Sequence, residues 1–386
     1  MTDDPLQLEG NLTCHLATIV QWKKVFRFKK DEVPPAPLRL VLQGHPARAM
    51  YIAVKHRLAD KVEANGGSME LGALLKAASE ISSEDHLYRI LRSCESEGIF
   101  SVKQDGDTVK VLNTKESRML IWGAPESLAY LVMHAHYETA LALNYLDDIV
   151  TSKDKSSKST AWDFYSPNQP FWAWLDQPEQ REARETFNQL MVNVSLREIP
   201  HICKGFPWEK FLDKVGGGKV CSVVDVGGGK GHLLKAMMDV ATFKPIVFDT
   251  HFMIDEAAGF WKGTDVELVK GDFFDPETIP MANVYILKHI LHDWSDAKSI
   301  DILKSICTKA GKIPNSRVMI IELVLDETKP LAPFESWGDI QMLNVVGGKE
   351  RSKKQWERDV ISKSGLQIEA VHSTGGTECI IECSLE

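Results

Sequence analysis

The sequence has no long uncharged apolar run and no basic stretch at its beginning. A helix that crosses a membrane needs about 20 consecutive apolar residues, so we expect no membrane partner. A secretory signal would begin with a basic segment, whereas this chain begins Met1-Thr2-Asp3-Asp4. These absences favour a cytoplasmic protein.

Cysteine and positive charge are also scarce. The 7 cysteines are scattered, without the paired spacing of a zinc site or the density of a disulfide scaffold. We interpret them as reduced thiols and expect no metal. The 45 basic residues are outnumbered by 54 acidic ones, and the formal net charge is -9. Such a chain repels polyanions, so nucleic acid is not an expected partner.

Residues 1–120 have the pattern of a small helical domain. Apolar residues recur at helical spacing over Met50–Leu58 and Leu71–Ala78. A third helix is predicted over Ser83–Gly98, and a hairpin with its turn at Asp105-Gly106 follows. Three helices and a hairpin predict a winged-helix module.

Residues 121–213 are predicted to be further helices, and the pattern changes from residue 214. Apolar runs alternate there with helical segments, beginning with Val220–Val226. Further strands are predicted at 245–248, 266–269, 283–287, 317–323, 367–372 and 378–383. This alternation is typical of a doubly wound α/β sheet that is buried on both faces. We therefore expect a Rossmann-like domain over residues 214–386.

A glycine-rich segment follows the first of these strands, and a predicted helix begins after it. The segment contains Asp225, Gly227, Gly229 and Gly231. Glycines allow positive φ and let the backbone approach a ligand closely. His232 breaks the dinucleotide fingerprint, and the residues of a P-loop do not follow. The spacing favours a nucleotide loop that need not hold a phosphate, and an ordinary turn is the alternative.

Acidic residues also follow the next two predicted strands. Asp249 ends the second strand, where a carboxylate can accept hydrogen bonds from ribose hydroxyls. Asp272 and Phe273 follow the third strand, where a carboxylate and a ring could flank an adenine. Because parallel strands end at one edge of a sheet, we expect these side chains to gather there. A helix cap is the alternative for either acid alone.

His292 lies just beyond the fourth predicted strand, at the same edge of the sheet. An imidazole there can act as a general base that takes the proton of a phenol. Glu322 and Glu350 could hold its second nitrogen, as the acid of a catalytic triad does. In the alternative, Asp293 or Ser295 caps a helix beside a packed His292. Glu350 would then be an exposed loop charge.

These segments together resemble the caffeate, flavonoid and hydroxyindole O-methyltransferase family. The likeness rests on the order and spacing of Val224–Gly229, Gly271–Phe274, His292–Asp296 and Gly347–Arg351. It covers residues 215–386 closely, and the helical half of the chain more weakly.

The resemblance implies a cofactor, a base and an assembly. S-adenosylmethionine would be held by Asp225, Gly227, Gly229, Asp249, Asp272, Phe273 and Lys288. His292 would be the base, with Glu322 and Glu350 beside it. The chain would form a homodimer in which residues 1–120 are the dimerisation domain and close the partner's pocket. Residues 121–213 would contribute the acceptor pocket.

The sequence departs from the family in two regions. Lys230 stands where threonine or serine is usual, and a cation beside a sulfonium must point away or find an acid. The acceptor region, 133–138 and 171–174, is also unusual. Candidates for the acceptor pocket are His134, Tyr137, Phe171, Met191, Trp337 and Met342. Core packing is the alternative role for these side chains.

The sequence thus predicts methyl transfer to a hydroxyl of a phenolic or hydroxyindole-like small molecule. One alternative acceptor is a small thioether acid of the dimethylsulfoniopropionate type, which has no proton to lose. His134 and Tyr137 could then hold the carboxylate. The non-enzymatic alternative is a winged-helix DNA-binding regulator. The mixed charges of residues 84–89 oppose it, because DNA affinity depends on cations that meet phosphates.

Overall fold

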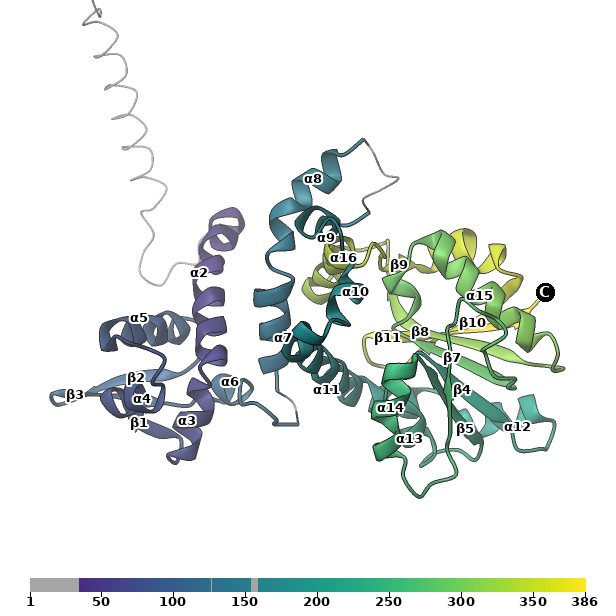
Figure 1. The fold of residues 1–386 in the computed structure, drawn as a ribbon, viewed down its shortest axis with the longest axis horizontal. Coiled ribbons are helices and arrows are strands. Elements are labelled where there is room, and N and C mark those ends of the chain that lie inside the picture. Colours follow the sequence, from purple (N-terminus) through teal and green to yellow (C-terminus); the bar gives the residue numbers. More distant parts are fainter. Residues whose placement is uncertain (1–34, 126, 154–158) are drawn as a thin grey trace, which may run out of the picture. The chain divides into compact units, whose positions relative to one another are not determined.

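The computed structural model describes residues 35–125, 127–153 and 159–386 (Figure 1). The chain divides into two compact units, Met1–Leu120 and Ile121–Glu386. Residues 1–34 of the predicted winged-helix domain lie outside the described residues. Among the described residues, no helix is both long and apolar enough to span a membrane.

The first unit combines short helices with a small antiparallel sheet. Its helices are α2 (Ala36–Lys55), α3 (Leu58–Ala64), α4 (Leu71–Ala77), α5 (Glu84–Glu95) and α6 (Lys115–Arg118). Its strands are β1 (Ser68–Glu70), β2 (Ser101–Asp105) and β3 (Thr108–Leu112), in the order β1-β3-β2. The segment Leu71–Ala78, the third helix and the hairpin are present as α4, α5 and β2–β3. The segment Met50–Leu58 is not one helix, because Arg57 takes a φ of 52° and separates the end of α2 from the start of α3. The sequence does not predict β1, because its 3 residues are too few for a periodic pattern.

Helix α5 shows how sequence signals set an element of this unit. The Ser83 hydroxyl accepts the His86 N–H at 3.2 Å and caps the first turn. Leu87, Leu91 and Cys94 follow at helical spacing and are buried. The helix is thus fixed by a cap at one end and by one apolar face.

The second unit is built on one large sheet. Its strands are β4 (Ser222–Val226), β5 (Lys244–Asp249), β6 (Glu267–Lys270), β7 (Val284–Lys288), β8 (Arg317–Leu325), β9 (Arg351–Ser352), β10 (Leu366–Ser373) and β11 (Glu378–Leu385). The order is β10-β11-β8-β7-β4-β5-β6, with β9 beside β8. Strands β4 to β8 pair in parallel, whereas β10 and β11 are antiparallel. The predicted α/β sheet is confirmed.

The predicted start of the first strand is two residues early. Val220 is exposed, and β4 begins at Ser222. The Ser222 N–H donates to Asn283 Oδ1 at 3.0 Å, which ties this end of β4 to the approach to β7. An apolar side chain by itself does not extend a strand beyond its hydrogen-bonded neighbours.

Both faces of the sheet are covered by helices (Figure 1). Val223 points into a core with α11 (Arg181–Gly205), α12 (Trp208–Gly216), α13 (His232–Met237) and α14 (His251–Phe260). Val224 points into the opposite core, with α15 (Asp296–Ala310) and the helical turn η5 (Trp356–Val360). Successive residues of a strand face opposite sides, so an apolar run is required wherever both sides are buried.

The region predicted to be helical, residues 121–213, begins with an interrupted stretch. It consists of α7 (Ala129–Met133), η1 (His134–Glu138), η2 (Ala142–Tyr145) and α8 (Leu146–Thr151). The His134 carbonyl accepts the Thr139 N–H at 3.3 Å and the Thr139 hydroxyl at 2.9 Å. This bond spans one residue more than an α-helical bond, so the helix widens to a π turn. Helices α9 (Ala161–Tyr165), α10 (Phe171–Leu175) and α16 (Pro333–Val345) pack nearby.

A buried arginine fixes the segment that follows β7. The Arg351 guanidinium donates to the carbonyl oxygens of Leu291 at 3.0 Å and Trp294 at 2.8 Å. It also donates to Asp296 Oδ1 at 2.9 Å and lies over the Trp356 ring. The turn η4 (Leu291–Asp293) is therefore bound to the chain that follows α16.

We predict that Arg351→Met destabilises the fold, because the carbonyl oxygens of Leu291 and Trp294 lose the guanidinium donor and Asp296 loses its cationic partner. The free energy of unfolding should fall by roughly 3 kcal/mol. Arg358→Met is the matched control, since Arg358 is exposed and pairs with its neighbour Asp359. Urea denaturation of both variants measures the difference, and equal midpoints would contradict the role given to Arg351.

Candidate active site

The glycine-rich segment forms a tight turn between β4 and α13. Gly227, Gly229 and Gly231 have φ angles of 70°, 58° and 79°. The Gly227 N–H donates to the Phe248 carbonyl at 2.8 Å. A side chain at Gly227 would overlap Ile290. The turn therefore requires glycine at this position, and it lies at the carboxyl edge of the parallel strands.

Two of the predicted acids flank this turn. Asp225 is buried, and burial raises the pKa of its carboxyl to about 7, although Lys288 opposes the rise. Asp249 Oδ2 accepts the Gly229 N–H at 2.8 Å and so fastens the turn to β5. One acid thus lies beneath the turn, and the other holds it in place.

Asp272 and Phe273 lie just beyond β6, the strand next to β5. Asp272 is exposed, and its Oδ1 accepts the Phe274 N–H at 2.9 Å. The Phe273 ring packs against Phe274 and Trp294, with centroids 5.0 and 6.0 Å away. The structure therefore brings both residues to the same edge of the sheet as Asp249.

Lys230, the cation that departs from the family pattern, is paired with an acid. Its Nζ lies 3.4 Å from Glu256 Oε2 on α14. Its carbonyl accepts the Trp261 indole N–H at 2.8 Å. The prediction that Lys230 points away or finds an acid is confirmed.

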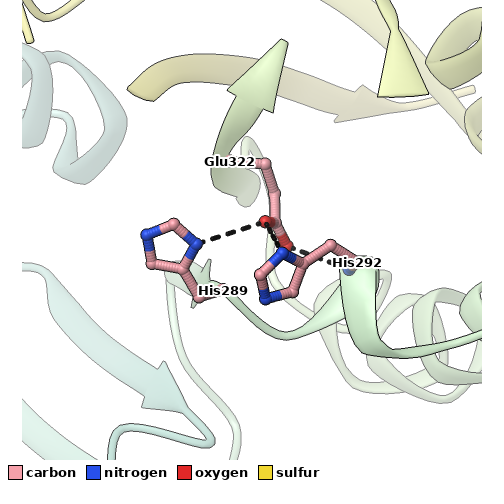
Figure 2. Close-up of side chains that lie close together, drawn as sticks. All are labelled: His289, His292 and Glu322. Atoms are coloured by element: carbon pink, nitrogen blue, oxygen red, sulfur yellow. Dashed lines mark hydrogen bonds and ion pairs between the residues drawn. The ribbon is translucent and has the colours of Figure 1, made fainter. Parts of the chain in front are cut away.

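His292 lies in η4, directly after β7. Its Nδ1 is 2.9 Å from Glu350 Oε1 and 3.7 Å from Glu322 Oε2, the carboxylate drawn in Figure 2. Its Nε2 is 3.7 Å from Asp293 Oδ1. A carboxylate only accepts, so the network assigns the proton of the neutral ring to Nδ1. Nε2 then carries the lone pair.

The loop with Glu350 packs directly on His292. Glu350 is 6% exposed, which contradicts the alternative of an exposed loop charge. Its N–H donates to Asp339 Oδ1 at 3.0 Å. The Lys349 N–H donates to the His292 carbonyl at 3.0 Å, and a side chain at Gly348 would overlap that carbonyl. Glycine thus permits the contact that brings Glu350 to the ring.

Glu322 lies at the centre of the site. Its Oε1 accepts the backbone N–H groups of Ile290, Leu291 and His292 at 3.1, 2.9 and 3.3 Å. The residue is fully buried within β8. Although burial opposes it, the nearby histidines lower the pKa of the Glu322 carboxyl. Glu322 therefore stays ionised and shapes the backbone that carries His292.

The charge on His292 follows from these neighbours. Burial by itself would lower the pKa of the imidazole. The carboxylates of Glu322, Asp293 and Glu350 outweigh burial and raise the pKa of His292 above its usual range. The free protein thus favours an imidazolium at neutral pH.

Three further residues belong to this cluster and were not predicted from the sequence: Glu198 on α11, His289 after β7, and Glu378 at the start of β11. His289 Nε2 lies 3.0 Å from Glu198 Oε2 and 3.9 Å from Glu378 Oε1. Lys288 Nζ donates to Glu198 Oε2 at 2.8 Å. The spacing of His289 and His292 is a signal that could have indicated His289. The two glutamates have no such signal, because their partners are distant in sequence.

Histidine and carboxylate atoms grouped in this way can also bind metal ions. Among the described residues, two such groups have ligand atoms within 4.8 Å of one another, and both include His289. Lys288 and the two imidazoles already pair with these carboxylates. Cationic groups of the protein therefore already pair with the carboxylates of this cluster. That the site binds no metal remains a prediction.

The predicted acceptor residues divide between interior and surface. His134 packs against the rings of Phe171 and Phe187, with centroids 6.1 and 5.5 Å away. Burial lowers the pKa of His134 to about 4, so this imidazole is neutral. Phe171 belongs to a buried core cluster, as the packing alternative expects. Tyr137, Met191 and Trp337 are exposed, and Met342 is half-buried.

A cavity of about 360 Å³ lies in the second unit. It is formed by α7, α11, the first turn of α16 and the loop between β10 and β11. Leu131, Leu190 and Val194 supply apolar lining, and Glu198 and Glu378 lie in its wall. The cavity therefore reaches the charged cluster around His289.

We predict opposite protonation states for two buried histidines. NMR titration of labelled imidazoles in the free protein should place the His292 midpoint above the usual 6.5, because carboxylates surround it. His134 should stay neutral down to about pH 5. Glu350→Gln should lower the His292 midpoint, since the variant loses a negative neighbour. A wild-type His292 midpoint at or below 6.5 would contradict this electrostatic account.

One family model and several known enzymes are similar to this chain. The O-methyltransferase domain family matches residues 173–367. Tabersonine 16-O-methyltransferase of Catharanthus roseus is 32% identical over 318 residues, which cover 80% of this chain and 84% of that enzyme. The mitomycin biosynthesis 6-O-methyltransferase of Streptomyces lavendulae is 29% identical and covers 85% and 88%, respectively.

Solved structures indicate the same family. The structure of a mitomycin 7-O-methyltransferase has a TM-score of 0.76 and 27% identity, covering 91% of this chain and 97% of that one. An O-methyltransferase from neocarzinostatin biosynthesis, solved with S-adenosylmethionine and 2-hydroxy-5-methyl naphthoic acid, has a TM-score of 0.68 and 26% identity. It covers 89% of this chain and 96% of that one. The sheet, the glycine turn and these relatives together show that the chain belongs to the S-adenosylmethionine-dependent O-methyltransferases of small molecules.

Proposed function

We propose that this enzyme methylates a hydroxyl of a phenolic or hydroxyindole-like acceptor, with His292 as the general base. The observation that carries the proposal is the 2.9 Å contact between His292 Nδ1 and Glu350 Oε1. It orients the ring and leaves Nε2 as the proton acceptor. The position of His292 at the carboxyl edge of the sheet supports the same role.

The chemistry requires a proton to leave the acceptor. S-adenosylmethionine, when bound, supplies a methyl group on a positively charged sulfur. His292 Nε2 would take the hydroxyl proton as the oxygen–methyl bond forms and the methyl–sulfur bond breaks, so the products would be a neutral thioether and an ether without a positive charge on oxygen. Glu350 and Glu322 stabilise the resulting imidazolium without taking its proton. Release of that proton to solvent restores the base.

The proposed cofactor residues are Asp225, Gly227, Gly229, Asp249, Asp272, Phe273 and Lys288. Two observations support them. The buried Asp225 carboxyl lacks enough compensating charge, so a cationic amino group is a suitable partner. Gly227 and Gly229 have positive φ angles of 70° and 58°, and glycine at such positions lets the backbone of the turn approach a ligand closely. Both features fit a ligand that combines an ammonium group with a nucleoside.

The proposed acceptor residues are His134, Tyr137, Phe171, Met191, Trp337 and Met342. The neocarzinostatin enzyme, a relative solved with a naphthoic acid, supports a flat, aromatic acceptor. Sulfur methylation is not favoured, because the relatives described above are named as O-methyltransferases.

We also propose a homodimer and a division of labour along the chain. Residues 1–120 would be the dimerisation domain, 121–213 the helical acceptor region and 214–386 the cofactor domain. The exposed Leu40, Val41 and Leu42 of α2 support a covered face in the first unit.

The homodimer predicts that light scattering reports twice the 43.3 kDa chain mass. A fully active monomer would contradict the dimer.

The cofactor assignment predicts that Asp249→Ala weakens S-adenosylmethionine binding. The Gly229 N–H loses its acceptor, so the turn loosens, and the ligand loses a carboxylate partner. We expect affinity to fall at least tenfold, the effect of losing one charge-assisted hydrogen bond. Asp255→Ala is the control, because Asp255 is an exposed acid that pairs with Lys270. Calorimetry on folded variants that finds equal affinities would overturn the assignment.

The base assignment predicts that His292→Ala lowers kcat by about a hundredfold or more. Cofactor affinity should hardly change. In the wild type, kcat should rise with pH, because the raised pKa of His292 keeps the base protonated at neutral pH. The deficit of the variant should shrink for acceptors acidic enough to ionise by themselves. Unchanged turnover in the variant, or an equal deficit with every acceptor, would refute the base role.

A further inference from the structure

One carboxylate oxygen stands between two histidine rings. His289 Nδ1 lies 3.6 Å, and His292 Nδ1 3.7 Å, from Glu322 Oε2, and the ring centroids are 5.1 Å apart. Figure 2 shows the two rings on either side of the Glu322 carboxylate. This oxygen is buried and has no hydrogen bond to any described residue. The two imidazoles therefore share it as an ionic partner.

The surroundings favour a positive charge on His289. Its Nε2 faces Glu198 at 3.0 Å and Glu378 at 3.9 Å. Burial and Lys288 oppose protonation, but Glu198 and Glu322 outweigh them and raise the pKa of His289. Its backbone has a φ of 52°, a left-handed conformation that is uncommon for residues other than glycine. The fold thus accepts local strain where it places this ring.

The surroundings of His292 also favour a positive charge. Glu322, Asp293 and Glu350 surround its ring with negative charge and stabilise its imidazolium. A general base that holds its own proton too firmly is unavailable at neutral pH. A positive charge on His289 weakens this stabilisation of the His292 imidazolium. It interacts with the same Glu322 carboxylate, and it repels a positive charge on His292.

We infer that His289 is a positioning residue for methyl transfer: its imidazolium competes with His292 for Glu322 Oε2 and eases loss of the His292 proton. The inference rests on the proposed function, in which His292 is the base. The charged groups around the pair come from several elements, namely Glu198 from α11, Lys288 from β7, Asp293 from η4, Glu322 from β8, Glu350 from the loop after α16 and Glu378 from β11.

The direct test is an NMR titration of labelled His292 in the ligand-free enzyme, which needs no knowledge of the acceptor. His289→Asn removes the charge, and asparagine tolerates the left-handed backbone. We expect the His292 midpoint to rise by about one pH unit, the scale of one charge at this separation. His289→Lys keeps a cation and should leave the midpoint near that of the wild type. An unchanged or lower midpoint in His289→Asn overturns the inference.

Kinetics separate this role from a structural one. With a naphthol that the enzyme accepts, kcat of His289→Asn at neutral pH should fall about tenfold, one decade per pH unit. A nitro-substituted form of the same naphthol is already ionised, so its turnover should hardly change. Equal losses for both acceptors would indicate damage to the fold and overturn the inference. If His289→Asn does not fold, His289→Gln is the second neutral variant, with the same expected results.

The inference and the proposed function fail in different ways. Full activity of His292→Ala would refute His292 as the base, whatever the titrations report. Loss of activity in His292→Ala, together with identical His292 midpoints in wild type and His289→Asn, would refute only the role of His289.

Discussion

A carboxylate buried in the middle of a sheet must be compensated by hydrogen bonds and opposite charges, and Glu322 is compensated by both. Its Oε1 accepts three consecutive backbone N–H groups, so the chain after β7 must turn tightly around it. Its Oε2 faces His289 and His292. The same carboxylate therefore sets the backbone path and the electrostatics of the base. The other features of the site are arranged around this requirement.

Compensation of Glu322 extends into a larger charge network. His289 balances Glu322 and in turn contacts Glu198, which also binds Lys288. Lys288 acts electrostatically on the buried Asp225 beneath the glycine turn. A continuous set of charges thus connects the proposed cofactor turn with the proposed base. In a buried site such charges are weakly screened, so a change in one is felt by the others.

Close packing holds the charged groups of this network at fixed separations. Gly227 lets the turn approach Ile290, and Gly348 lets a loop reach the His292 carbonyl. Arg351 binds two carbonyl oxygens of the segment around η4. Gly227, Gly348 and Arg351, which make these contacts, have no proposed catalytic role. Small side chains and one buried guanidinium allow the approach, and the ionisable groups then meet at hydrogen-bond distance.

The sequence by itself determined the α/β sheet, the glycine turn and the candidates Asp225, His292 and Glu350, because apolar runs, glycines and chemistry-bearing residues leave local signals. It also indicated that Lys230 must point away or find an acid. Only the tertiary structure decided which acids meet which bases. Glu198 and Glu378 appear as ordinary residues of a helix and a strand until β7 and β11 bring them to His289. The physical reason is that protonation depends on burial and on charges a few ångströms away, and those neighbours are far apart along the chain.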